Sequence, residues 1–234
     1  MIFTYNQVQQ LKIDGYINYS SNSFGLDSID HCFNKPYFTT FPHDVTYQFN
    51  SLGYRERDIK LYQENSIIVI GDSFTVGLGL PMELTYTSQL EKLTTIPVLN
   101  FSMNGASNDW IARKLGIILP LFNPTAIIVH YSFSHRRENN KLSWTDDERI
   151  LCDPLPDVQE NYTNWLVNHN TIKSLVNHIP TYYSFIPNWH TQQINFTDNL
   201  VPVQQVDYAR DFFHYGKTTC LNLAKQYADR IAQQ

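Results

Sequence analysis

The sequence of 234 residues has only three cysteines, Cys32, Cys152 and Cys220, and no two of them form a CxxC pair. An odd number of widely spaced cysteines supplies neither a disulfide framework nor the four ligands of a structural zinc site. We therefore expect reduced thiols, as in the cytoplasm, and no metal ion.

The sequence also lacks an excess of positive charge and a long apolar run. Its 17 basic and 22 acidic side chains give a net charge of −5, the wrong sign for a protein that binds phosphate backbones, so we expect no nucleic acid partner. No stretch approaches the roughly 20 apolar residues of a membrane helix, and the N-terminus has no charged segment followed by an apolar one. We expect no membrane insertion, no signal peptide and a cytoplasmic location.

The composition is that of one folded domain of ordinary size. Hydrophobic residues make up 42% of the chain and charged residues 17%, which excludes disordered and fibrous proteins. Residues 1–63 show no sustained period of 2 or 3.6, which predicts an irregular N-terminal arm with one short strand. Their many Phe and Tyr residues predict that the arm packs on the main domain, with disorder of residues 1–40 as the alternative. The main domain is predicted over residues 64–234.

From Ser66 onwards, short apolar runs alternate with longer amphipathic segments, as in a parallel sheet with crossover helices. The run Ile67-Ile68-Val69-Ile70 is β-branched on both faces, which is typical of a central strand covered by helices. The predicted strands are 67–70, 97–101, 126–131 and 181–186, with a short fifth strand near 201–206, and the predicted helices cover about 84–93, 108–121, 157–178 and 216–232. The charged segment 136–156 is predicted to be a surface excursion.

Polar residues follow the predicted strands, where an open parallel sheet binds its ligands. Ser73 lies at the turn from the first strand into a helix, where its hydroxyl can face a substrate beside backbone N–H groups. A hydroxyl needs a base to become a nucleophile, and an imidazole oriented by a carboxylate is the usual one. Asp211 and His214 lie three residues apart just before the last predicted helix, and they supply this pair.

The order of these motifs resembles that of the GDSL/SGNH hydrolases. Gly71-Asp72-Ser73-Phe74 after the first strand, Gly105 after the second and Asp211-x-x-His214 near the C-terminus are similar to three of that family's four blocks. The resemblance extends over about residues 49–230. It implies a three-layer α/β/α sandwich with a mainly parallel, flavodoxin-like central sheet, and it implies no cofactor.

The resemblance also implies a role for each matching residue. Ser73 would be the nucleophile and His214 the general base and then the general acid, while Asp211 would orient His214. The backbone N–H groups of Ser73 and Gly105 would form the oxyanion hole.

The fourth block of the family, a GxND sequence after the third strand, is missing from this chain, which instead reads Ser132-Phe133-Ser134-His135. Two side chains are candidates to replace its Asn as an oxyanion donor: Asn108, at the start of the helix after Gly105, and His135, near the position of the lost Asn. We favour Asn108, because an amide donates a hydrogen bond without having to be protonated. A site with neither replacement would be slower by roughly 10²–10³-fold.

Several other residues have a structural and a functional interpretation. Asp72 is predicted to brace the turn through backbone hydrogen bonds, and His130 to be a buried, hydrogen-bonded core residue. Arg136 and Arg137, followed by Glu138, are predicted to be a solvated charge cluster, with a clamp for an anionic substrate group as the alternative. Four tryptophans can serve the core or a platform for sugar rings: Trp110, Trp144, Trp165 and Trp189.

The sequence thus predicts a serine hydrolase that cleaves a carboxylic ester of a small molecule or carbohydrate, and it favours removal of acetyl groups from sugars. One alternative is a catalytically degenerate binding module of the same fold, which the missing block favours. The other is an acyltransferase that passes the acyl group to a sugar hydroxyl.

Overall fold

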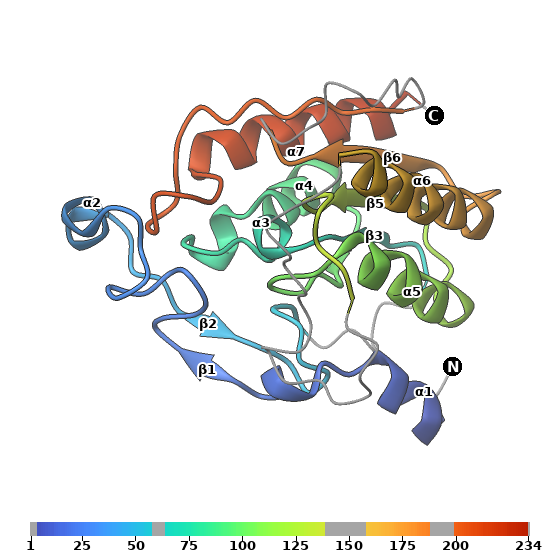
Figure 1. The fold of residues 1–234 in the computed structure, drawn as a ribbon, viewed down its shortest axis with the longest axis horizontal. Coiled ribbons are helices and arrows are strands. Elements are labelled where there is room, and N and C mark those ends of the chain that lie inside the picture. The colour runs from blue at the N-terminus through green and yellow to red at the C-terminus, as the bar shows by residue number, and fades with distance from the viewer. Residues whose placement is uncertain (1–3, 58–63, 139–157, 188–198, 234) are drawn as a thin grey trace.

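The computed structural model describes residues 4–57, 64–138, 158–187 and 199–233. Within them, a four-stranded sheet forms the centre of the molecule, in the order β4–β3–β5–β6, and all its neighbouring strands are parallel (Figure 1). The strands are β3 Ile67–Ile70, β4 Val98–Asn100, β5 Ala126–Tyr131 and β6 Thr181–Phe185. The four main strands predicted from the sequence are therefore confirmed, as is the parallel character of the sheet.

Two layers of helix cover the sheet, one on each face (Figure 1). The helices are α3 Ser73–Val76, α4 Tyr86–Thr94, α5 Asn108–Ile118, α6 Val158–Leu175 and α7 Lys217–Ile231, with short 3₁₀ turns at η3 Met82–Leu84 and η4 Leu119–Leu121. Ile68 and Ile70 of β3 pack in the core shared with α5 and α6, whereas Ile67 and Val69 pack in the core shared with α4 and α7. This alternation buries both faces of the strand and gives the predicted three-layer α/β/α sandwich.

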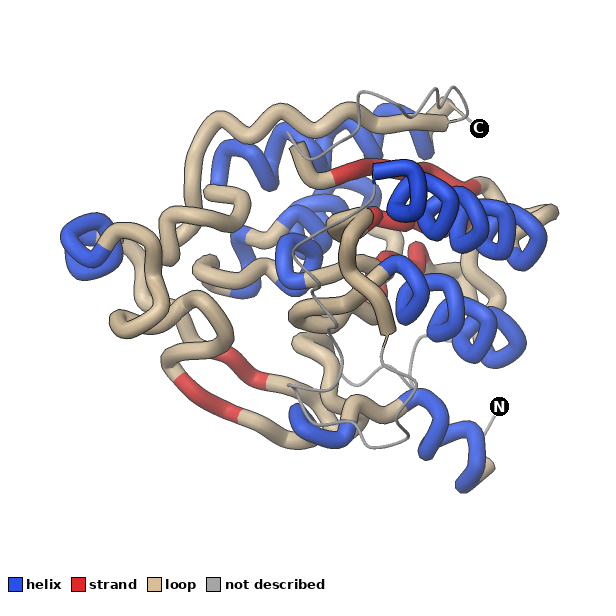
Figure 2. Tube along the Cα trace, viewed as in Figure 1, coloured by secondary structure: helices blue, strands red, loops and turns tan. Residues whose placement is uncertain are grey.

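The N-terminal segment contains more regular structure than the sequence predicted, although most of it is loop (Figure 2). Its elements are α1 Tyr5–Leu11, η1 Asp14–Tyr16, β1 Ser20–Ser21, α2 Lys35–Thr40 and β2 Tyr47–Gln48. The strands β1 and β2 pair antiparallel and stand apart from the central sheet. Thr4 and Gln7 form a capping box at the start of α1. This local helix signal lies within the segment that was predicted to be irregular.

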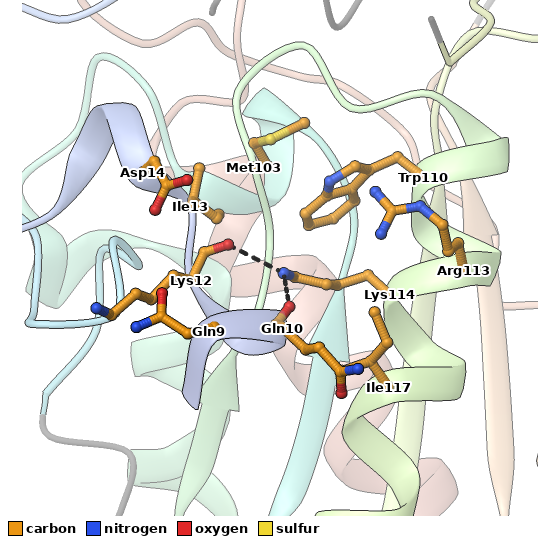
Figure 3. A pocket seen from close by; sticks show the side chains of 10 residues that line it. All are labelled: Gln9, Gln10, Lys12, Ile13, Asp14, Met103, Trp110, Arg113, Lys114 and Ile117. Atoms are coloured by element: carbon orange, nitrogen blue, oxygen red, sulfur yellow. Dashed lines mark hydrogen bonds between the residues drawn. The ribbon is translucent and has the colours of Figure 1, made fainter. Parts of the chain in front are cut away.

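A cavity of about 220 Å³ lies in the seam between α1, η1 and α5 (Figure 3). The ammonium group of Lys114, on α5, crosses this seam and donates hydrogen bonds to the carbonyl oxygens of Gln10 (2.8 Å) and Lys12 (3.2 Å) at the end of α1. Burial, together with the nearby charge of Arg113, lowers the pKa of Lys114 to about 7. The side chain thus closes the carboxyl end of α1 and ties the N-terminal segment to the helical layer.

Two further sequence predictions have different outcomes. The fifth strand near 201–206 is wrong: this segment has no strand, and it meets β6 only where the Val201 N–H donates to Tyr183 O at 2.8 Å. Most of the excursion predicted over 136–156 lies outside the described residues. Among the helices that the structure describes, none combines the length and apolar character needed to span a membrane.

Candidate active site

The first component of the site is the turn from β3 into α3, which carries Ser73. Asp72 caps the helix, because its side chain accepts a hydrogen bond from the Phe74 N–H at 3.1 Å, as the sequence predicted. Gly71 is required for the close approach of this turn, since a Cβ atom there would lie 2.3 Å from Thr75 Oγ1. The turn therefore holds Ser73 at the carboxyl edge of the sheet, where parallel sheets bind ligands.

The second component is the turn that carries Asp211 and His214. One carboxylate oxygen of Asp211 accepts hydrogen bonds from the N–H groups of Phe213 and His214, both at 3.0 Å. Phe212, which lies between Asp211 and His214 in the sequence, adopts φ +59°, a left-handed conformation. The chain turns here, and the side chains of Asp211 and His214 are both buried. The Arg210 N–H donates to Gly79 O at 3.0 Å, which fixes this turn beside the loop after α3.

The two turns bring three predicted residues together in one chain of hydrogen bonds. His214 Nε2 lies 2.8 Å from Ser73 Oγ, and Nδ1 of the same ring bonds the Asp211 carboxylate. Ser73 is 4% exposed, His214 1% and Asp211 0%. Burial opposes ionisation of Asp211, but the charge and hydrogen bonds of His214 and the N–H groups around it hold its pKa below the ordinary value. An imidazole oriented in this way can accept the proton of the serine hydroxyl.

Two backbone N–H groups near Ser73 have no acceptor among the described residues: those of Ser73 itself and of Gly105. Gly105 lies in the loop after β4 at φ +73°, a conformation that favours glycine. This loop is attached to the turn that carries Ser73, because the Met103 N–H donates to Gly71 O at 3.2 Å. Neither N–H group is therefore occupied by a hydrogen bond to another described residue.

The two candidates for the missing Asn donor occupy different environments. Asn108 is fully buried, and its amide bonds the backbone of Ser132 in both directions: Nδ2 donates to Ser132 O at 3.1 Å and Oδ1 accepts from Ser132 N at 2.9 Å. These bonds use one of the two Nδ2 hydrogens of the amide. His135 lies beside Phe133, with ring centroids 5.7 Å apart.

The predicted solvated cluster at 136–138 is wrong. Arg136 Nη1 lies 2.9 Å from the Asp72 carboxylate and its side chain is 14% exposed. Arg137 donates to Ser134 O at 2.6 Å and to Asn161 Oδ1 at 2.8 Å, and Glu138 pairs with Arg113. The sequence offered no signal for the Arg136–Asp72 pair, because its partners are 64 residues apart.

His130 is buried and hydrogen-bonded, as predicted. Its Nδ1 lies 2.5 Å from Ser184 Oγ, and its Nε2 lies 3.1 Å from the hydroxyl of Tyr215, the residue after His214. Burial lowers the pKa of His130 to about 4, so the ring is neutral at physiological pH and supports the turn without a charge.

The tryptophan platform has no support in the described residues. Trp110 and Trp165 are each 2% exposed and belong to the core, and Trp144 and Trp189 lie outside the described residues. In the part of the chain that the structure describes, no group of three or more His, Cys, Asp or Glu side chains is placed to hold a metal ion.

Comparison of the sequence finds no matching family model and no matching curated protein. The structure, in contrast, is similar to solved esterase structures. A family two carbohydrate esterase from Clostridium thermocellum, in complex with cellohexaose, is 13% identical, with 74% of this chain and 65% of that chain covered and a TM-score of 0.51. An active-site mutant of a family two carbohydrate esterase from the same organism is 12% identical, with 81% and 67% covered and a TM-score of 0.50. A G-D-S-L family protein described as lipolytic, from Desulfitobacterium hafniense DCB-2, is 13% identical, with 71% and 99% covered and a TM-score of 0.48.

At these identities the likeness establishes the fold. The chain is an α/β/α sandwich whose polar site lies at the carboxyl ends of a parallel sheet. More particularly, it shares this fold with a family two carbohydrate esterase, while its sequence motifs resemble those of the GDSL/SGNH hydrolases.

Proposed function

We propose that this protein is a serine hydrolase that cleaves carboxylic esters. The observation that carries the proposal is the chain of hydrogen bonds from Ser73 Oγ through the His214 ring to the Asp211 carboxylate, with 2.8 Å between Oγ and Nε2. Ser73 begins α3 at the carboxyl edge of the sheet, the edge at which open parallel sheets bind their ligands. The fold shared with solved esterases supports the same reaction class.

In the proposed reaction, Ser73 Oγ attacks the ester carbonyl carbon while its proton passes to His214 Nε2. The N–H groups of Ser73 and Gly105, with the second amide hydrogen of Asn108, stabilise the resulting oxyanion. The carbon–oxygen bond to the alcohol then breaks, and His214 returns the proton to the departing oxygen. A water molecule attacks the acyl-enzyme in the same way and releases the carboxylic acid, which restores the serine hydroxyl.

Replacement of the nucleophile gives the direct test. Ser73→Ala should reduce hydrolysis of p-nitrophenyl acetate by about 10³-fold or more, because covalent catalysis needs the hydroxyl. Circular dichroism should show that the variant keeps its fold, since the change removes one oxygen atom. Ser174→Ala serves as the matched control, because that hydroxyl is exposed and bonds only its own helix at Asn170 O. Turnover by Ser73→Ala at the wild-type rate would refute the proposal.

Carbohydrate esters are the favoured substrate class. Aromatic side chains lie beside the His214 turn and remain open to solvent: Phe33 is 64% exposed and its ring lies 5.1 Å from that of Phe213 in a tilted arrangement, and Tyr208 and Phe212 are exposed as well. Phe213 also lies 5.1 Å from the His214 ring, so these rings extend from the proposed catalytic base. Exposed aromatic rings suit the apolar face of a sugar. The esterase of similar fold that was solved with cellohexaose supports this choice.

A substrate panel separates this proposal from its alternatives. Acetylated cello- and xylo-oligosaccharides should be hydrolysed with a higher kcat/KM than p-nitrophenyl esters of increasing chain length. A product with the acyl group on an added sugar would indicate the acyltransferase. Binding of sugars without turnover of any ester would indicate the degenerate binding module.

A further inference from the structure

The carboxylate of Asp72 is buried next to the proposed nucleophile. It is 0% exposed, and its two oxygens accept three hydrogen bonds: from the Phe74 N–H at 3.1 Å, from Ser132 Oγ at 3.0 Å and from Arg136 Nη1 at 2.9 Å. Among the described residues, Arg136 is the one that pairs with it as a cation. A buried carboxylate is unfavourable without such a partner.

The guanidinium of Arg136 lies where three strand ends meet. It contacts Asp72 after β3 and Ser132 after β5, where Nη1 lies 3.0 Å from Oγ, and it approaches Ala106 O, after β4, at 3.5 Å. Its guanidinium carbon, Cζ, lies over the Phe133 ring, 4.5 Å from the ring centre. The position is therefore specified by contacts from several elements and is not that of a mobile surface arginine.

The charge of Asp72 would oppose the proposed reaction if it were left alone. Acyl transfer creates an oxyanion beside the N–H groups of Ser73 and Gly105, one residue from Asp72. Two negative charges in a region of low dielectric repel each other strongly, whereas a neutralised carboxylate does not. The same carboxylate cannot simply be dispensed with, because it caps α3 and so fixes the nucleophile turn.

We propose that Arg136 is a positioning residue for the proposed esterase: it neutralises Asp72, so that the carboxylate can hold the Ser73 turn without repelling the oxyanion. This inference rests on the proposed function. It assigns a task to the segment after β5, where the family block is missing. Asn108 fixes the backbone of that segment at Ser132, and Arg136 delivers the compensating charge.

A cycle of variants tests the charge pairing. Arg136→Gln should lower kcat by about 10- to 100-fold with KM nearly unchanged, because the unpaired carboxylate acts on the transition state and not on the bound ester. Adding Asp72→Asn to Arg136→Gln should recover at least about ten-fold in kcat, since the Asn side chain still accepts from the Phe74 N–H but carries no charge. Arg136→Lys, which keeps the charge, should fall less than Arg136→Gln.

Arg137→Gln is the matched control, because Arg137 bonds Asn161 and the backbone carbonyls of Ser134 and Arg136, and none of these bonds involves the Asp72 carboxylate; its kcat should stay within about two-fold of wild type. Thermal melting is measured for every variant, so that a folding defect is seen separately from a loss of kcat.

The inference is overturned if the double variant is no faster than Arg136→Gln, or if Arg136→Lys loses as much kcat as Arg136→Gln. Should Arg136→Gln fail to fold, the double variant and Arg136→Lys decide: both must retain at least a tenth of wild-type kcat. If the wild-type protein hydrolyses esters no faster than Ser73→Ala does, the proposed function itself is refuted.

Discussion

Two titratable groups at the candidate site, Asp211 and His130, have their charge set by their surroundings. Asp211 is held ionised by His214 and by two backbone N–H groups, whereas burial keeps His130 neutral below the same turn. The ionised carboxylate can fix the ring of His214 with a hydrogen on Nδ1, which leaves Nε2 as the acceptor that faces Ser73. These surroundings support the proposed roles of His214 as base and Asp211 as orienting group.

Asn108 gives a prediction with two separate readouts. Asn108→Ala should lower the free energy of unfolding by about 2–4 kcal/mol, because it leaves the buried N–H and C=O groups of Ser132 without partners. If its second amide hydrogen also donates to the oxyanion, kcat should fall by about 10²–10³-fold with little change in KM. Urea unfolding and steady-state kinetics measure the two effects.

His135→Ala is the comparison for this prediction and should change kcat only a few-fold. A loss of stability in Asn108→Ala without a loss of kcat would limit Asn108 to a structural role. A large loss of kcat in His135→Ala would instead make His135 the side-chain donor to the oxyanion.

At the scale of elements, local patterns predicted what lies within one segment. The run Ile67–Ile70 predicted a buried strand, and Asp211-x-x-His214 predicted a turn that places both side chains on one side. The helix predicted over about 84–93 is confirmed as α4, with the short turn η3 directly before it. Thr85 separates the two as the N-cap of α4, since its hydroxyl accepts a hydrogen bond from the Ser88 N–H. The helix predicted over 157–178 is α6 in its described part, and it ends before Pro180.

Tertiary partners far apart in the sequence could not be predicted in this way. Arg136 pairs with Asp72 across 64 residues and Lys114 bonds the end of α1 across more than 100, and nothing in the local sequence marks either pair. The strand proposed near 201–206 failed for a related reason. Its alternating Val residues fit a strand, but among the described residues the segment makes a backbone hydrogen bond to β6 only through the Val201 N–H.

The seam between α1 and α5 gives a prediction on pH. Lys114 has a pKa of about 7 in the folded protein against 10.5 for a free lysine, because burial disfavours its charge. Between these values the unfolded chain binds more protons than the folded one, so the free energy of unfolding should rise with pH from about 7 to 10. Below pH 7 both states are charged and the penalty of burying the ammonium group is fully present.

Lys114→Met removes this titration while it keeps much of the side-chain volume. The difference in unfolding free energy between wild type and Lys114→Met should grow in favour of the wild type over this range, by at most about 4 kcal/mol. Urea titrations at pH 7, 8, 9 and 10 measure it. Parallel pH dependences of the two proteins would contradict the buried, uncharged state of Lys114.

At the scale of the whole molecule, residues 4–57 and the sheet contribute to one apolar core. Leu11, Tyr16 and Tyr54 belong to the same buried cluster as Leu99 and Ile111. Polar contacts extend this core towards the site. The Tyr47 hydroxyl donates to Asp27 at 2.6 Å and accepts from the Gly79 N–H at 2.8 Å, in the loop that fixes the His214 turn. We therefore propose that the arm of residues 1–63 and the main domain over 64–234 unfold together.

The ion pair of Asp27 with Arg210 tests this cooperativity. Asp27 is fully buried and accepts two hydrogen bonds from the guanidinium, at 2.9 Å and 2.6 Å, across 183 residues of sequence. Asp27→Ala should lower the free energy of unfolding by about 3–5 kcal/mol, because it leaves a largely buried guanidinium unpaired. Near-UV circular dichroism and tyrosine fluorescence should still report one coincident transition. Asp30→Ala, at an exposed neighbour, should change stability by less than about 0.5 kcal/mol. Two separated transitions would mean that the arm unfolds independently.

Labelling with a fluorophosphonate tests the central claim, an activated serine at position 73, most directly. The probe forms a covalent bond with a serine only when a base accepts the hydroxyl proton, so it reports the Ser73–His214 pair without any assumption about substrate. Intact mass should show one adduct per chain, and peptide mapping should place it on Ser73. Ser73→Ala and His214→Ala should remain unlabelled in the same incubation, while Ser174→Ala should label at the wild-type rate. No adduct on the folded wild-type protein, or an adduct on Ser73 that persists in His214→Ala, would contradict the account.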